Sequence, residues 1–227
     1  PLKSFSLSFQ ESSFDESEHA ERVAKHLGLD HETLHFCSAD LPRVLNHMGQ
    51  QMSEPLTDGS YPAMWMLSEQ IASRGFKIAL SGDGADEHFG GYPTYFAHKL
   101  APIAGTAKPL LSRVTQSLPS STQNLSSTYL ARRFVEGSSL PTPRRNQVWL
   151  GAFLPEEIDE LMREPATPWS AVDRWSSPAA GISDRALQAM FLDQRLYLAE
   201  GVLQKVDRAS MSHGLEVRSP FLDHLLV

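Results

Sequence analysis

Residues 1–80 alternate short strand patterns with amphipathic helix patterns, and no other feature of the sequence constrains the fold as strongly. Strand patterns cover residues 5–9, 33–36 and 76–80, and helix patterns separate them. Strands that alternate with helices usually pair in parallel, with the helices packed against the sheet. We therefore predict the order β-α-β-α-α-β and an α/β fold with a parallel sheet flanked by helices.

The helix pattern between the first two strands is the best-specified local element. It begins at Asp15, has Glu18 three residues later as in a capping box, and stops at Gly28. Its apolar side chains recur at the spacing of one helix face: Ala20, Val23, Ala24 and Leu27. Two further helices are predicted, one after residue 40 and one over about residues 62–73, with a turn-rich segment at 54–60 between them.

From about residue 97, strand patterns give way to helical periodicity. A Ser/Thr-rich stretch at residues 117–128 and proline-rich turns at 140–143 and 165–168 interrupt it. Residues 186–206 are apolar on nearly every face, which predicts a buried central helix that carries Lys205 into the interior. We therefore predict an α/β nucleotide-binding portion at residues 1–96 and a mostly helical portion at residues 97–227 of the same domain.

A loop rich in glycine and acidic residues follows the third strand pattern. Gly82 and Gly84 let the backbone turn sharply and approach a ligand closely. Asp83, Asp86 and Glu87 would repel one another unless a cation or a specific task kept three carboxylates together. The spacing is not the G-x-G-x-x-G of dinucleotide-binding folds, because Glu87 occupies the last glycine position. The loop is therefore predicted to hold a metal-bound polyanion.

A second block, residues 203–223, supplies the basic groups that the loop lacks, among them Lys205 and Arg218. Together with residues 5–9, the two blocks resemble the synthetase domain of the glutamine-hydrolysing asparagine synthetases and of the related β-lactam synthetase. Their order and separation also fit that family, and the resemblance covers most of the chain. It implies an adenine-nucleotide α-hydrolase-like (ATP pyrophosphatase) fold, and a ligase that uses ATP and Mg²⁺ to adenylate a carboxylate before ammonia displaces AMP.

The resemblance also assigns binding roles to particular residues. Ser81 and Gly82 match positions that contact ATP, and Leu7 matches the strand residue that lies against the adenine. Asp86 matches an aspartate that helps to hold Mg²⁺. For Leu7, membership of a core strand would explain an apolar residue equally well without any ligand.

Two further residues match catalytic positions of the family. Lys205 matches the lysine that lies against the α-phosphate and the developing negative charge. Asp83 stands where asparagine synthetases often have Glu, a carboxylate that the family's chemistry links to the step after adenylation. The shorter side chain withdraws the carboxylate by about 1.5 Å, which is enough to alter which nucleophile is handled.

Structural explanations of several charged residues remain open. Asp86 and Glu87 also suit the N-terminus of a helix that starts near residue 85. Arg218 is the best candidate in the second block for contact with substrate or phosphate, although it and its charged neighbours could instead form an ion-pair network. Asp58, in the turn at 54–60, could face the same cleft at the carboxyl ends of the strands.

Composition excludes several classes of function. The net charge of −7 lacks the basic surface typical of nucleic-acid-binding proteins, and no apolar run approaches the roughly 20 residues that span a bilayer. We therefore expect neither nucleic acid nor membrane as a partner. The single cysteine, Cys37, cannot form an internal disulfide, which suits the cytoplasm. The histidines show no zinc-binding pattern, and no G-x-S-x-G nucleophile motif occurs.

The resemblance further implies that the chain is a middle segment of a longer protein. The family carries an S-G-G-x-D-S loop before the segment that matches residues 5–9, an N-terminal glutaminase domain and a helical tail, and none of these occurs in the chain. The implied parent enzyme converts aspartate, ATP and glutamine to asparagine, AMP, pyrophosphate and glutamate. It would receive ammonia from the missing glutaminase domain, and it could be a homodimer. A related ligase that amidates another carboxylate or closes a β-lactam, and a non-catalytic nucleotide-binding fragment, are the alternatives.

Overall fold

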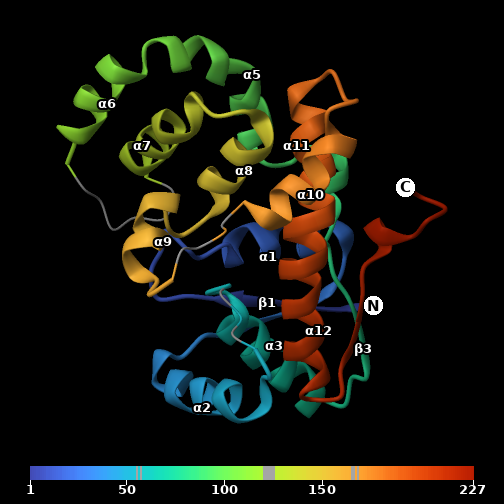
Figure 1. The fold of residues 1–227 in the computed structure, drawn as a ribbon. Helices are drawn as coiled ribbons and strands as arrows, with labels where there is room; N and C mark the ends of the chain where they lie inside the picture. Colours follow the sequence, from blue (N-terminus) through green and yellow to red (C-terminus); the bar gives the residue numbers. More distant parts are fainter. Residues whose placement is uncertain (55, 57, 120–125, 165–166, 168) are drawn as a thin grey trace. The chain divides into compact units, whose positions relative to one another are not determined.

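The fold was analysed in a computed structural model, which describes residues 1–54, 56, 58–119, 126–164, 167 and 169–227 (Figure 1). Parts of three predicted segments lie outside the described residues, namely positions 55 and 57, positions 120–125, and positions 165, 166 and 168. The chain divides into two units, residues 1–83 with 201–223 and residues 84–200 with 224–227. Each unit is described by itself.

The first unit contains all the strands of the described chain and is of mixed α/β type. Its elements are β1 (Lys3–Ser8), α1 (Ser17–Leu27), β2 (Asp30–His35), α2 (Leu41–Gln51), α3 (Tyr61–Ser73), β3 (Ile78–Leu80), α12 (Leu203–Met211) and β4 (Glu216–Arg218), with short 3-10 turns at Ser38–Asp40 and Pro220–Leu222. The order up to β3 confirms the predicted β-α-β-α-α-β.

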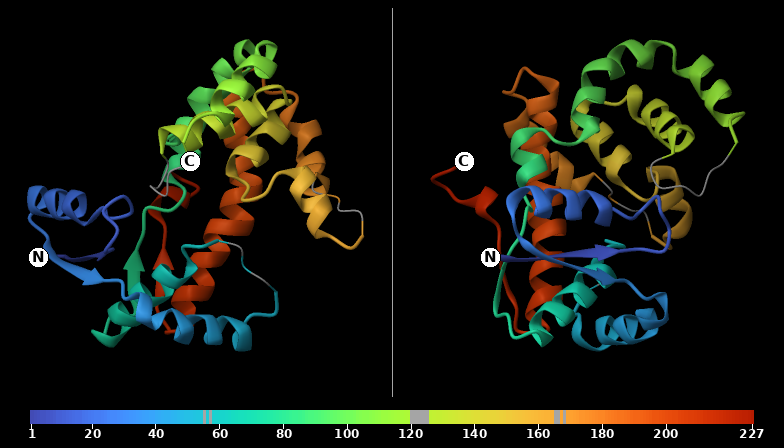
Figure 2. Two further views of the ribbon diagram at one scale, coloured as in Figure 1. Left: turned by 90° about the vertical axis from the view of Figure 1, so that its left-hand side faces the viewer. Right: turned by 180° about the vertical axis from the view of Figure 1, so that it is seen from behind.

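The strands pair in parallel, as predicted. β1 pairs with β2 from Lys3 opposite Asp30 to Ser8 opposite His35, and β3 pairs with β4. Among the described residues these are two separate two-stranded sheets. Helices α1 and α3 both contact β1, and they lie on opposite sides of the β1–β2 pair (Figure 2). Small parallel sheets flanked by helices are therefore the architecture of this unit.

The two faces of the β1–β2 pair differ in chemistry because side chains alternate along a strand. On the α3 side, Phe5 and Leu7 pack with Leu34, Ile71 and Leu215 in an apolar cluster. Serine, threonine and histidine side chains take the other positions. Two of these residue pairs bond across the strands: Ser4 Oγ lies 2.9 Å from His31 Nδ1, and Ser8 Oγ lies 2.5 Å from His35 Nδ1. The pair thus presents one apolar and one polar face.

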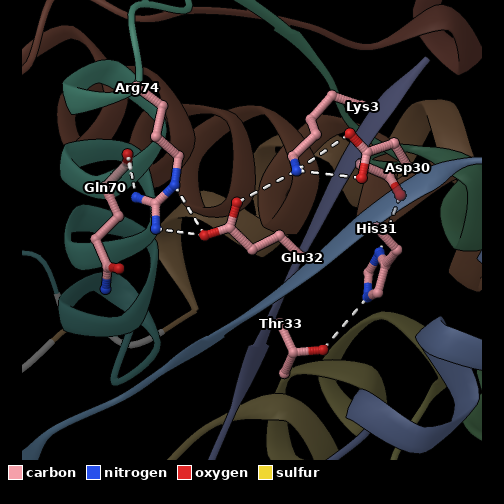
Figure 3. Close-up of polar contacts among 8 residues, drawn as sticks. Lys3, Asp30, His31, Glu32, Thr33, Gln70 and Arg74 are labelled. Carbon is pink, nitrogen blue, oxygen red and sulfur yellow. Dashed lines mark hydrogen bonds and ion pairs between the residues drawn. The ribbon is translucent and has the colours of Figure 1, made fainter. Parts of the chain in front are cut away.

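Near the start of β1 and β2, the α3 side of the pair carries a row of charged side chains (Figure 3). Lys3 Nζ lies 3.3 Å from an Asp30 carboxylate oxygen and 3.4 Å from Glu32 Oε2. Arg74, after the end of α3, donates from Nε and Nη2 to Glu32 Oε1. The Arg74 guanidinium lowers the pKa of Glu32, so this carboxylate is charged between two cations and ties β2 to both β1 and α3.

The start of α1 differs from the predicted one. The helix begins at Ser17, and the Asp15 carboxylate accepts a hydrogen bond from the Ser17 backbone N–H at 3.1 Å. The predicted capping box, with Glu18 at its third position, is therefore wrong, because an aspartate two residues before an N–H forms a local turn instead. Gly28 does end the helix, with φ of 67°, a backbone conformation that suits glycine.

The second unit, residues 84–200 with 224–227, is mostly helical. Its helices are α4 (Ala85–Phe89), α5 (Pro93–Thr106), α6 (Lys108–Gln116), α7 (Ser127–Ser138), α8 (Thr142–Leu150), α9 (Pro155–Leu161), α10 (Ser170–Ala179) and α11 (Arg185–Asp193). Ala101, Val148 and Trp149 are buried in its apolar core. Within the described residues, no helix of either unit has the length and apolarity needed to cross a membrane.

A chain of buried polar side chains links α5, α8 and α11 in this unit. His98 Nε2 lies 3.0 Å from Asn146 Oδ1, and the Asn146 amide donates to Asp193 Oδ1. All three residues are fully buried. Burial raises the pKa of Asp193 to about 6 and lowers the pKa of His98 to about 4. The interior of this unit therefore favours the neutral form of both groups.

The predicted buried helix at residues 186–206 is wrong in two respects. Helix α11 is followed directly by π-helical turns at Gln194–Val202 and then by α12, so the segment is not one regular α-helix. The segment is also not buried on every face, since Leu187 is 55% exposed. An apolar residue can stay on the surface at modest cost, and the charged Arg195 gives the segment a polar position as well.

Candidate functional site

The carboxyl ends of β3 and β4 bring the two sequence blocks together. Leu80 at the end of β3 is paired with Arg218 at the end of β4. The Ser81 backbone N–H donates to the Arg218 carbonyl oxygen at 2.9 Å, which continues the ladder into the loop. The Ser219 hydroxyl then donates to the carbonyl oxygen of Asp83. Residues separated by more than a hundred positions thus form one loop cluster.

Two positions in this cluster are open to a ligand. The Ser81 hydroxyl is buried and has no hydrogen-bond partner among the described residues. Buried hydroxyl groups in folded proteins almost always have a partner. A β-carbon at Gly82 would meet nothing within 4 Å, so its backbone is also approachable. The cluster thus offers an unused hydroxyl and bare backbone at the carboxyl end of a strand, where α/β proteins bind ligands.

Lys205 is held by the turn that precedes α3. Its ammonium group lies 3.0 Å from Asp58 Oδ2 and donates to the Ser60 hydroxyl at 3.0 Å. The Lys205 side chain is only 15% exposed, so it is not a surface lysine that extends into solvent. The Asp58 carboxylate also accepts from the Ser60 backbone N–H at 2.9 Å. Partial burial would raise the pKa of Asp58, but hydrogen bonds from Ser60 and Lys205 outweigh it and lower the pKa.

This turn includes a functional candidate that the sequence did not single out. Ser60 contacts both Asp58 and Lys205. The spacing Asp-Gly-Ser is typical of a turn in which the aspartate accepts from the backbone two residues later, and that signal could have identified it. Residues 55 and 57, which belong to this turn, lie outside the described structure.

The two arginines of the second block, Arg208 and Arg218, form separate ion pairs. Arg218 donates from Nε to Glu216 Oε1 at 2.8 Å, and its side chain is 60% exposed. Arg208 lies 2.6 Å from Glu54. Such exposed pairs contribute little to stability. The carbonyl of Arg218 therefore belongs to the loop cluster, whereas its guanidinium lies at the surface within reach of solutes.

Leu7 lies on β1 and packs in the apolar cluster of Leu34, Ile71 and Leu215. This contact fully explains an apolar side chain at that position, so the structural alternative has direct support. The predicted contact of Leu7 with adenine stays a prediction.

In the second unit, Asp86 and Glu87 lie in the first turn of α4, as the helix alternative predicts. Their environments differ sharply. Glu87 is 1% exposed and accepts a hydrogen bond from the Tyr92 hydroxyl at 2.8 Å. Burial, followed by this bond to Glu87, raises the pKa of Tyr92. Glu87 is therefore committed to the interior, which supports its structural role.

Asp86 is exposed and forms no ion pair with any lysine, arginine or histidine that the structure describes. Its carboxylate lies over Gly91, where a β-carbon would come within 1.8 Å of Asp86 Oδ1. No group of three or more metal-ligating side chains occurs among the described residues. Mg²⁺ commonly takes only one or two carboxylates and completes its shell with water and phosphate oxygens. An exposed carboxylate without an ion-pair partner fits that requirement as a single protein ligand.

These features define a class of protein. The first unit is of α/β type, and the carboxyl ends of its parallel strands carry polar loops. Among its described residues, Lys205 and Asp58 form a partly buried ion pair. The family model described as asparagine synthase matches residues 1–227. The chain therefore belongs to the asparagine synthase family.

Curated relatives agree with this family at low identity. A putative glutamine-hydrolysing asparagine synthetase of Mycobacterium tuberculosis is 25% identical over 98% of the chain and 34% of its own length. Asparagine synthetase 1 of Bacillus subtilis is 25% identical over 99% of the chain and 35% of its own length. The amidase chry2 of Gibberella zeae is 28% identical over 99% of the chain and 36% of its own length. The chain thus spans about a third of these relatives. No solved structure matches it significantly.

Proposed function

We propose that the chain is the synthetase part of an ATP-dependent amidotransferase that makes asparagine from aspartate, ATP and glutamine through β-aspartyl-AMP. The observation that carries the proposal is the meeting of the two blocks, through Ser81 N–H to the Arg218 carbonyl and the Ser219 hydroxyl to the Asp83 carbonyl. Family membership supports the same chemistry. The proposal includes an adenine-nucleotide α-hydrolase-like fold for the α/β portion, a cytoplasmic location and glutaminase-derived ammonia.

In this proposal, the residues of the first unit bind and orient ATP. The free Ser81 hydroxyl and the open backbone at Gly82 contact the nucleotide, and Leu7 supports the adenine. Lys205 stabilises the negative charge that develops on the α-phosphate as the carboxylate attacks. A fixed ammonium group does this well because it needs no reorientation during the reaction, and Asp58 with Ser60 fixes it here.

Two acidic residues have separate roles. Asp86 would hold Mg²⁺, which would neutralise the leaving pyrophosphate. Asp83, whose backbone is tied to Ser219, acts after adenylation by orienting the intermediate or by accepting a proton from the incoming ammonia. Arg218 is available for contact with the substrate, since its guanidinium is largely exposed.

The test is product formation by the full-length protein. With ATP, Mg²⁺ and ammonia, the rate of AMP and pyrophosphate release should depend on added aspartate, and asparagine should appear in equal amount. If the release of AMP and pyrophosphate depends on a different carboxylate, that compound and not aspartate is the substrate. Saturable ATP binding without any turnover would instead favour a non-catalytic nucleotide-binding module.

One observation favours a second candidate within the same chemistry. A relative with 28% identity is named an amidase, and position 83 carries Asp where asparagine synthetases often have Glu. The alternative is a ligase that adenylates and amidates another carboxylate, or closes a β-lactam. Substituting Asp83→Glu separates the two, because a gain in aspartate-dependent synthesis favours the first and a loss of all synthesis favours the second.

A further inference from the structure

The second unit contains a hollow of about 670 Å³ with a strongly cationic lining. It lies among the end of α5, the connection from α7 to α8, the end of α10 and the start of α11. Arg145 and Arg185 both line it, and no aspartate or glutamate is among the lining residues. Gln188 and five hydroxyl side chains complete the polar part of the wall; the hydroxyls are those of Thr106, Ser138, Ser139, Thr142 and Ser176.

Arg145 is unusually buried for an arginine, with 4% of its surface exposed. Its Nε donates to the Gly137 carbonyl at 3.3 Å and its Nη2 to the Leu140 carbonyl at 2.5 Å. Its Nη1 is buried and has no hydrogen-bond partner among the described residues. A buried cation that lacks both a counter-charge and a full set of acceptors is costly.

Arg185 adds a second positive charge to the same wall. It is exposed and forms no ion pair with a carboxylate in the described parts of the chain. Burial lowers the pKa of Arg145, and the nearby charge of Arg185 lowers it further. The two guanidinium groups therefore repel each other, and an anion bound near both would relieve this repulsion.

The N-terminus of a helix also favours an anion in this hollow. Thr142 and Pro143, the first residues of α8, line the hollow. The residue before them, Pro141, offers no side-chain cap to the first turn. Pro143 has no N–H, and the Arg145 backbone N–H donates to the Pro141 carbonyl at 2.9 Å. The Thr142 N–H and the positive end of this nine-residue helix are therefore the features that favour an anion at this point.

We propose that this hollow binds a small phosphate monoester. Two guanidinium side chains and a helix N-terminus line it, and a tetrahedral phosphate can accept from both kinds of donor at once. The hydroxyls of Thr106, Ser138 and Ser176 donate to backbone carbonyls of their own helices and make the wall polar without serving as donors to the phosphate. The apolar side chains of Pro102 and Leu140 also line the hollow, and its volume exceeds that of inorganic phosphate. A compact organic group attached to the phosphate would fill the remaining space. The lining shares no residue with those assigned to ATP above, so the proposal does not depend on the proposed function.

The proposal can be tested by calorimetry on the full-length protein with glycerol 3-phosphate, inorganic phosphate and acetate as probes. Glycerol 3-phosphate should bind saturably and more tightly than inorganic phosphate, and acetate should bind least. Arg185→Gln should weaken the binding of glycerol 3-phosphate about tenfold or more, the usual effect of losing one hydrogen bond between charged groups.

Matched variants keep the test decisive. Arg174→Gln removes the same charge from an exposed position on α10 that does not line the hollow, and it should leave binding unchanged. Arg145→Lys keeps the buried charge but loses the guanidinium, and it should also weaken binding in protein that unfolds cooperatively. Binding that survives both Arg185→Gln and Arg145→Lys, or the absence of any saturable phosphate binding, would overturn the proposal. Acetate binding as tight as that of glycerol 3-phosphate would overturn the assignment to phosphate.

Discussion

The ion pair between Lys205 and Asp58 has the geometry of a positioned cation. The ammonium group has two oxygen partners at 3.0 Å and little solvent around it. Two fixed acceptors leave the third N–H of the ammonium group for a further acceptor. At the scale of single residues, this is the most specific arrangement in the first unit.

Lys205→Ala in the full-length protein should lower aspartate-dependent AMP formation by a factor on the order of 10² to 10³, because one preorganised charge in the transition state is worth about that much. Glutaminase activity should be retained, because the resemblance places it in a separate domain. Lys77→Ala, at an exposed position before β3, is the matched control and should have full activity. Unchanged AMP formation in Lys205→Ala would show that Lys205 has only a structural role.

The two acidic residues of the glycine-rich loop should respond differently to loss of charge. Asp86→Asn should raise the Mg²⁺ concentration needed for half-maximal synthesis, because it replaces an anionic oxygen ligand with an amide of the same shape. Asp83→Asn should preserve the isotope exchange between pyrophosphate and ATP but impair amide formation. Equal loss of both activities in both variants would contradict this division of roles.

At the scale of elements, the buried polar chain in the second unit makes stability depend on pH in two opposing ways. Asp193 has a pKa of about 6 in the folded unit, against about 3.9 when unfolded. Its contribution to stability is therefore present below pH 4 and is lost as the pH rises through 6. His98 has a folded pKa of about 4, against about 6.5 when unfolded. Its contribution is present above pH 6.5 and is lost as the pH falls through 4.

Asp193→Asn should remove one of these opposing effects and expose the other. The free energy of unfolding of the variant, relative to the parent, should rise by up to about 3 kcal/mol between pH 4 and pH 6, since two pKa units correspond to that amount. Urea unfolding at several pH values measures this difference. Asp173→Asn, at a surface position that is half exposed, should show no comparable trend. A difference that stays constant with pH would mean that Asp193 is ionised in the folded protein.

The elements differ in how well the sequence predicted them. Local periodicity was sufficient for the order of the first strands and helices, and Gly28 marked the end of α1 because its positive φ is a local requirement. The π-helical turns at Gln194–Val202 have no such local signal. The contact of Lys205 with Ser60 joins residues 145 positions apart, so it depends on tertiary packing. The sequence could name Lys205 and Asp58 separately, but not their pairing.

At the scale of the whole molecule, the chain spans about a third of the length of its curated relatives. We expect the 227-residue chain alone to form no AMP, because it has no S-G-G-x-D-S loop to bind the pyrophosphate. AMP release and calorimetry with Mg-ATP, each measured on the chain alone and on the full-length protein, check this expectation. Micromolar binding by the chain alone would show that it is a complete nucleotide-binding module, and that the phosphate-binding loop has been assigned wrongly.

The close approach of Gly91 to Asp86 has a consequence for mutational tolerance. A β-carbon at position 91 would lie 1.8 Å from Asp86 Oδ1 and 3.2 Å from its Cα, so any other residue must push the carboxylate aside. In a selection for growth without asparagine, a library randomised at position 91 should return almost only glycine. A library at the neighbouring Gly90, where a β-carbon would meet only the flexible end of Met190 but φ is 75°, should also admit asparagine. The two adjacent glycines would thus be restricted for different reasons, one by a neighbouring side chain and the other by its own backbone.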